Sequence, residues 1–190
     1  MAYSGAKTIV LVARSKLSES KLSEVSQLMS LTGANIILHQ ADASSSKCMK
    51  ALQQRLNTLP SVAGIVYTAM VLKDELIPSL NTNHFRDVAA PKIKGAFLLH
   101  EMSLQMDLDF FVLFSSIASL LGNPGQASYA AANAFLDGLA QHRQHFLGLP
   151  AASINWEPIK GPGVLQREEA IAEHLSRAGY FLLPSAQGKP

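Results

Sequence analysis

The stretch FFVLFSSIASLLGNPGQASYAAANAFLD, residues 110–137, decides the fold of this chain. It opens on a run of aromatic and aliphatic residues that ends in Ser115-Ser116, which is typical of a strand buried in a parallel sheet. Glycine and proline at 122–125 then predict a turn, and the alanine-rich run from Gln126 predicts a helix that packs closely against its neighbours. Strand, turn and helix in this order indicate one unit of a parallel α/β sheet.

The same alternation continues on both sides of this stretch. Further strands are predicted at residues 8–13, 35–39, 62–67 and 151–156, and further helices at 18–31, 45–59, 83–105 and 167–178. The helix from Gln126 is predicted to reach residue 145, and Pro91 is expected to kink or break the helix over 83–105. Residues 1–190 are therefore predicted to form a single α/β domain with a doubly wound parallel sheet, whose ligands bind at the carboxyl ends of the strands.

Composition excludes several classes of function. The 16 Lys and Arg residues nearly balance 14 Asp and Glu residues, so the net charge of +2 provides no electrostatic footprint for nucleic acid or for an anionic membrane. Apolar runs are of strand length, far short of a membrane span. Cys48 is the only cysteine, and no secretory signal is visible, so we expect a cytoplasmic protein without an internal disulfide. His142 and His145 share a helix face, but no further ligands accompany them, and we expect no metal site.

A candidate reductive site lies where the strand over 110–116 meets the next helix. Tyr129 and Asn133 are four residues apart and leave the same helix face. Reduction of a ketone needs a proton donor beside the carbonyl oxygen and a hydroxyl, such as that of Ser116, to position this oxygen. A tyrosine serves as the donor when a nearby cation makes its phenol more acidic, and Lys92 or Lys94 could be that cation. From the residues alone, Tyr129 is better explained as a side chain that packs at the rim of the core.

A family resemblance bears on this choice. The chain resembles the ketoreductase domains of modular polyketide synthases and type I fatty acid synthases, a branch of the short-chain dehydrogenases, over residues 91–96, 99–101, 111–119, 122–137, 148–151 and 153–156. The resemblance implies a Rossmann-like fold and the NADPH-dependent reduction of a β-ketoacyl group. The substrate would be carried by the phosphopantetheine arm of an acyl carrier protein, and neighbouring synthase domains would be further partners.

The resemblance also assigns roles to individual residues. In this branch a lysine upstream of the tyrosine replaces the one that usually follows it by four residues. Ser116 would polarise the keto oxygen and Tyr129 would donate the proton. Lys92 would lower the phenol pKa and contact the nicotinamide ribose, while Asn133 would complete a proton relay. The expected cofactor-binding residues are Arg14 and Ser15 at the ribose 2′-phosphate, Asp42 at the adenine edge, Met70 over the nicotinamide, and again Lys92 and Tyr129.

Four positions bear on the stereochemistry of the product. Leu72-Lys73-Asp74 resembles the Leu-Asp-Asp fingerprint of B-type ketoreductases and keeps its final aspartate. Leu121 stands where A-type enzymes have a tryptophan, and Pro124 matches the B-type pattern. The resemblance therefore implies a D-configured β-hydroxyl, although a helix-capping role for Asp74 is the alternative.

The chain departs from the family pattern at its N-terminal end. The phosphate-binding glycine loop would lie about 30 residues before Arg14, so we expect this sequence to lack the first strand, the glycine loop and most of the first helix. The strand would belong between those at 8–13 and 62–67, and NADPH binding by this chain alone is expected to be weak or absent. Two alternatives to the reductase remain: a non-catalytic remnant of a synthase, and a free-standing short-chain dehydrogenase, against which Lys92 and Asn133 argue.

Overall fold

The computed structural model describes residues 1–157, 159–160 and 183–184. The strands follow the predicted pattern, because β-branched and aromatic residues favour extended backbone at each position. Their bounds are β1 Thr8–Ala13, β2 Asn35–Gln40, β3 Gly64–Tyr67, β4 Phe110–Ser116, β5 Ala152–Trp156, β6 Ile159–Lys160 and β7 Leu183–Pro184. The five longer strands confirm those that the sequence predicts.

Helices alternate with these strands, as expected of βαβ units. Their bounds are α1 Glu19–Thr32, α2 Ser46–Leu56, α3 Thr82–Ala89, α4 Gly95–Ser103, α5 Ala118–Leu121 and α6 Ala127–Leu147, with short 3-10 turns at Ala2–Ser4 and Ile77–Ser79. The single-turn helix α5 is not among the predicted helices. The helix predicted over 167–178 lies outside the described residues.

The helix predicted over 83–105 passes through Pro91 without a break. Between α3 and α4, Ala90–Lys94 forms a π-helical turn. Proline has no N–H to donate and its ring crowds the preceding turn, and a wider turn accommodates both effects. The structure therefore has a local widening of the helix at Pro91 in place of a break, and Lys92 is one of the residues of this π-helical turn.

The strand pairs that the structure describes are all parallel. β1 pairs with β2 from Thr8 opposite Asn35 to Ala13 opposite Gln40, and β4 lies between β3 and β5. Among the described residues these two ladders are not joined, so β1 and β3 each keep one edge without a strand partner. The structure thus confirms a parallel α/β fold and has the interruption that was expected between these two strands.

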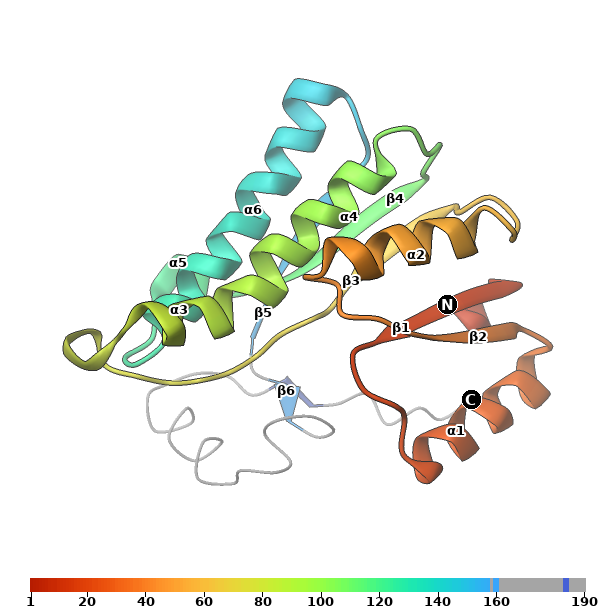
Figure 1. Ribbon diagram of the computed structural model, residues 1–190, viewed down its shortest axis with the longest axis horizontal. Helices are drawn as coiled ribbons and strands as arrows, with labels where there is room; N and C mark the ends of the chain where they lie inside the picture. The colour runs from red at the N-terminus through yellow and green to blue at the C-terminus, as the bar shows by residue number, and fades with distance from the viewer. Residues whose placement is uncertain (158, 161–182, 185–190) are drawn as a thin grey trace.

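Helices cover both faces of the β1–β2 pair. Val10 packs against a cluster that contains Met49 and Leu52 of α2. Leu11, the next residue along, lines a hollow together with Leu22 of α1. Successive side chains of a strand point to opposite faces, so α1 and α2 lie on opposite sides of this pair, as Figure 1 shows. This is the doubly wound arrangement.

The main core lies between the β3–β4–β5 sheet and the helices α4 and α6, which run side by side in Figure 1. β4 buries alternate residues, namely Phe111, Leu113 and Ser115, whereas the residues between them stay partly exposed. The α4 and α6 helices both pack on the face that Phe111 and Leu113 share.

A buried arginine joins α4, α6 and β4 in this core. The Arg143 side chain is fully buried, and its Nη1 donates to His100 Nδ1 and to Ser103 Oγ, each at 2.9 Å. Its guanidinium carbon lies 4.0 Å from the centroid of the Phe111 ring. Because Arg143 donates to it, His100 Nδ1 must be unprotonated, so the structure requires a neutral His100.

His142, which a metal site on α6 would have used, packs instead against aromatic rings. Its ring centroid lies 6.2 Å from that of His100 and 5.5 Å from that of Phe146. In the part of the chain that the structure describes, no group of three or more His, Cys, Asp or Glu side chains could hold a metal ion. The helices of that part are also too short or too polar to cross a membrane.

The neutral His100 predicts a loss of stability in acid. Burial, together with the charge of Arg143, lowers the pKa of His100 below its ordinary value of 6.5. The unfolded chain therefore takes up a proton that the folded protein resists, and stability falls as the pH drops below about 6.5. We expect the urea midpoint to fall between about pH 7.5 and about pH 5.5, and to fall less in His100→Gln, whose amide does not titrate. An exposed control, His145→Gln, should keep the wild-type pH dependence, and an equal slope in both variants would contradict the assignment.

Candidate active site

A lysine and a tyrosine meet where the carboxyl end of β4 faces the first turns of α6. Lys92 is only 2% exposed, and its Nζ donates to the backbone oxygen of Phe114 at 2.8 Å. The same Nζ lies 5.4 Å from the centroid of the Tyr129 ring. Lys94 is exposed on the outer side of the same turn. Of the two lysines that the residues alone left open, the structure therefore brings Lys92 to Tyr129.

Burial controls the charge of Lys92. It lowers the pKa of this ammonium to about 8, while the negative charge of Asp137 acts in the opposite direction. The described residues offer Nζ one hydrogen-bond acceptor, the Phe114 carbonyl, although an ammonium carries three protons. Lys92 therefore keeps donors for a ligand, and its charge changes near neutral pH.

Tyr129 is held as a neutral phenol. Burial raises its pKa, polar contacts with the Ser116 and Asn133 side chains lower it, and the charge of Asp74 raises it, so the pKa lies above its ordinary value of 10.0. Burial is the largest of these effects, because a phenolate is costly to desolvate. That Lys92 makes the phenol more acidic stays a prediction. A phenol with a raised pKa still carries the proton that a general acid needs.

Asn133 and Ser116 complete the group around Tyr129. Asn133 is fully buried, and its Nδ2 donates to the Tyr129 backbone oxygen at 2.8 Å. Among the described residues its Oδ1 is buried without a hydrogen-bond partner. Ser116 is partly exposed, and its Oγ accepts a hydrogen bond from the Ala118 amide at 3.2 Å. An acceptor without a partner and a lysine with spare donors, on two residues that both contact Tyr129, suit the hydroxyl groups of a sugar, so these residues fit a nucleotide ribose.

A polar cluster that was not predicted lies behind these residues. Asp137 accepts hydrogen bonds from side chains of α5 and β5, and the members of this cluster are Ser115, Ser119, Asp137, Ser153 and Asn155. One signal in the sequence could have revealed it. Tyr129, Asn133 and Asp137 recur at four-residue spacing and therefore share one face of α6.

The loop that contains Leu72 and Asp74 lies against the turn before α6. Gln126 Nε2 donates to both carboxylate oxygens of Asp74 at 3.1 Å, and the Glu75 amide donates to the Gly125 oxygen at 2.8 Å. Leu72 is partly buried, whereas Pro124 is exposed and Leu121 is 72% exposed. Asp74 thus joins two loops and is not a helix cap.

Two further contacts complete this region. Lys73, where the family fingerprint has an aspartate, forms an ion pair with Asp87 of α3. Met70 lies at the start of the same loop, with its sulfur 3.9 Å from the Tyr129 hydroxyl. The loop therefore reaches the hydroxyl end of the Tyr129 side chain.

The residues predicted to hold the adenosine half of a cofactor lie at the ends of β1 and β2. Arg14 and Ser15 are exposed directly after β1. Asp42 Oδ1 accepts from the Ser44 amide at 2.9 Å and from Ser44 Oγ at 2.7 Å. These bonds lower the Asp42 pKa, and the charges of Arg14 and Lys94 lower it further. The carboxyl end of β1 thus carries a guanidinium, that of Arg14, whose charge lowers the pKa of the Asp42 carboxylate after β2.

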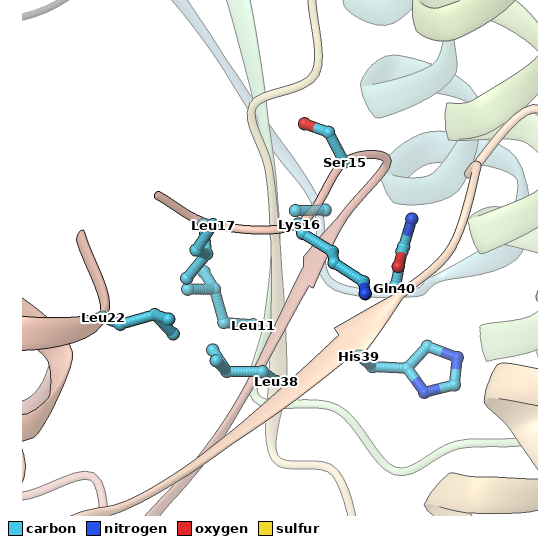
Figure 2. Close-up of a pocket in the computed structure, with 9 residues that line it drawn as sticks. Leu11, Ser15, Lys16, Leu17, Leu22, Leu38, His39 and Gln40 are labelled. Atoms are coloured by element: carbon cyan, nitrogen blue, oxygen red, sulfur yellow. The ribbon is translucent and has the colours of Figure 1, made fainter. Parts of the chain in front are cut away.

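A separate hollow of about 280 Å³ lies beside the β1–β2 pair. Figure 2 shows leucine side chains gathered on the side of α1, with His39 and Gln40 at the far side of the strands. Ser15 is the one predicted site residue among those that line it, and its hydroxyl points away from the leucines. The apolar lining identifies this hollow as an incompletely filled seam between α1 and the strands.

Comparisons with known proteins agree with this geometry. Residues 1–161 match the KR domain family. The chain belongs to the KR domain family. It is 39% identical over 191 residues to a 6-methylsalicylic acid synthase of Arthrobotrys oligospora, covering 94% of this chain and 11% of that protein. It is 38% identical over 173 residues to a phenolphthiocerol synthesis polyketide synthase of Mycobacterium marinum, covering 90% of this chain and 8% of that one.

Solved KR domains share the fold. A ketoreductase domain from the bacillaene assembly line superposes with a TM-score of 0.86 at 33% identity, covering 96% of this chain and 45% of that one. A structure of A-type ketoreductases from a modular polyketide synthase superposes with a TM-score of 0.88 at 32% identity, covering 96% and 38%. The chain thus spans less than half of these structures and about a tenth or less of the two synthases. The overall fold is that of ketoreductases, an oxidoreductase family.

The turn that carries Lys92 depends on a close approach between Gly95 and Tyr67. The Tyr67 hydroxyl donates to the Pro91 oxygen, and a Cβ added at Gly95 would overlap this hydroxyl. We expect Gly95→Ala to lower the free energy of unfolding by about 1–3 kcal/mol, because Tyr67 is buried and must move. Gly138→Ala, in open space on α6, should instead raise it by about 0.5–1 kcal/mol. Urea unfolding measures both variants, and equal effects would contradict the steric role of Gly95.

Proposed function

We propose that this KR domain reduces a β-ketoacyl group on an acyl carrier protein to a β-hydroxyacyl group with NADPH, in the biosynthesis of a polyketide. The observation that carries the proposal is the buried Lys92 beneath the ring of Tyr129, at the carboxyl end of β4 where Ser116 presents its hydroxyl. A proton donor, a cation and a hydroxyl on neighbouring elements are the groups that carbonyl reduction requires.

Each of these side chains has a distinct task in the proposed reaction. Ser116 donates a hydrogen bond that orients the β-keto oxygen toward Tyr129. NADPH, when bound, supplies the hydride that reduces the β-carbon. Tyr129 gives its proton to the oxygen of the new alcohol, and the charged Lys92 stabilises the phenolate left behind. Asn133 Oδ1, which has no protein partner among the described residues, accepts a hydrogen bond in the chain that returns a proton to Tyr129.

NADPH is the proposed cofactor because the residues suit both of its ends. The spare donors of Lys92 suit the hydroxyl groups of the nicotinamide ribose, and Met70 beside Tyr129 suits the nicotinamide ring. Arg14 and Ser15 are proposed to bind the 2′-phosphate, since guanidinium pairs well with phosphate, and Asp42 the adenine edge. The protein is proposed to act in the cytoplasm, beside the other domains of a synthase.

A D-configured β-hydroxyl is the proposed product. Asp74, fixed by Gln126 next to the Tyr129 end of α6, supports a B-type arrangement of the loop with Leu72. Two further positions support the B-type arrangement: Leu121 stands where A-type enzymes have a tryptophan, and Pro124 matches the B-type pattern. The likeness in overall fold extends to a structure described as A-type, so the proposal rests on these side chains. Chiral chromatography of the reduced thioester tests it, and an L product would overturn it.

The central test replaces the proton donor. Purified wild-type chain with NADPH on the order of 1 mM and a β-ketoacyl carrier protein is expected to form the β-hydroxyacyl product, detected by mass spectrometry. Tyr129→Phe should slow the reaction by about 10²–10⁴-fold, because the general acid is lost while the ring remains. The exposed Tyr3→Phe is the matched control and should keep full activity. No product from the wild-type chain would overturn the proposal in favour of a non-catalytic role, and an active Tyr129→Phe would remove Tyr129 from its task.

The pH dependence of the reaction tests Lys92. Because burial lowers the Lys92 pKa to about 8, the charged form is present below this pH and is lost above it. We expect kcat/KM, which reports the free enzyme, to fall as the pH rises above about 8. The exposed Lys94→Met variant should keep this alkaline limb unchanged. A profile that stays level to about pH 10 would contradict the role of Lys92.

A further inference from the structure

Asp137 connects three elements behind the proposed active site. From α6, its Oδ2 accepts a hydrogen bond from Ser119 Oγ of α5 at 2.7 Å and from Asn155 Nδ2 of β5 at 3.0 Å. Its Oδ1 accepts a hydrogen bond from Ser153 Oγ, also on β5. A carboxylate with three donors from two other elements is a strongly constrained group, since charged hydrogen bonds are stronger than neutral ones.

The partners of Asp137 in turn hold the end of β4. Asn155 Nδ2 lies 3.3 Å from Ser115 Oγ and 3.4 Å from the backbone oxygen of Ser116. Ser119 Oγ lies 2.9 Å from the same Ser116 oxygen, so its single proton is shared between this oxygen and Asp137. The side-chain hydrogen bonds from Ser119 and Asn155 to β4 are therefore at Ser115 and Ser116.

We propose that Asp137 is a positioning residue of the ketoreductase, which anchors Ser119 and Asn155 and thereby fixes the end of β4 on which Ser116 lies. The inference rests on the proposed function of Ser116 and Lys92. It adds a residue that touches neither substrate nor cofactor and acts through its neighbours.

Asp137 also acts on Lys92 through its charge. Burial raises the pKa of Asp137, but the hydrogen bonds of Ser153, Ser119, Ser115 and Asn155 outweigh this and lower it overall, so the carboxylate is ionised. No Lys, Arg or His in the described ranges forms an ion pair with it.

The groups that face Lys92 are the Phe114 carbonyl from β4 and, from α6, the Tyr129 ring and the charge of Asp137. Only the last of these is ionised. The negative charge raises the pKa of Lys92 and keeps more of it protonated, which opposes the effect of burial.

The test measures the pKa of Lys92 by NMR titration of the labelled side-chain nitrogen in the full chain, with Lys92→Met to assign the signal. Asp137→Asn keeps the shape of the side chain and removes its charge. We expect the Lys92 pKa to fall by about half a pH unit, a roughly threefold fall in the ratio of charged to neutral lysine. Asp109→Asn makes the same change in charge at the other end of β4, where the carboxylate is exposed, and should leave the Lys92 pKa unchanged.

A second measurement compares the rates of reduction. In Asp137→Asn we expect kcat to fall about tenfold with little change in KM, and the alkaline limb of the pH profile to move to lower pH. A folded Asp137→Asn chain with an unchanged Lys92 pKa and an unchanged pH profile would overturn the inference, because a merely structural role would move neither. A third outcome separates the two proposals. If Asp137→Asn shifts the Lys92 pKa but the wild-type chain forms no product, the proposed function is overturned and the coupling of Asp137 to Lys92 stands.

Discussion

The hydrogen bond from Lys92 to the Phe114 carbonyl is the constraint on which the rest of the site depends. A buried ammonium is costly unless a polar partner meets it, and here that partner belongs to the backbone of a central strand. The bond ties the π-helical turn to β4, one strand away from Tyr67, whose hydroxyl holds the oxygen of Pro91. The lysine is therefore fixed against Tyr129 by backbone groups.

Two buried cations differ in the number of hydrogen-bond partners that the described residues give them. The Arg143 guanidinium donates hydrogen bonds to His100, Ser103 and the Pro150 oxygen, so it joins α4 to α6. Lys92 donates to one protein oxygen and keeps spare donors, and the Asn133 Oδ1 atom has no hydrogen-bond partner among the described residues. Buried polar groups that lack partners are expected at functional sites and not in the core.

The polar cluster around Asp137 links these observations to the sheet. β4 presents apolar residues to α4 and α6 along most of its length, and polar contacts replace them only at its last two residues. A strand end held by side-chain hydrogen bonds is more precisely placed than one held by apolar contacts, because hydrogen bonds are directional. The hydrogen bonds therefore fix the position of Ser115 and Ser116 at the end of β4.

The amino-acid sequence by itself determined the order of strands and helices, the parallel sheet and the pairing of Tyr129 with Asn133, because hydrophobic periodicity and helical spacing are local properties. Only the tertiary structure decided which lysine reaches Tyr129. Lys92 and Lys94 belong to the same π-helical turn at Pro91, but Lys92 lies on its buried side and Lys94 on its exposed side. It also decided that burial raises the pKa of Tyr129 and that Asp137 meets side chains of α5 and β5. Both follow from burial and from contacts between segments far apart in the chain, which no local pattern records.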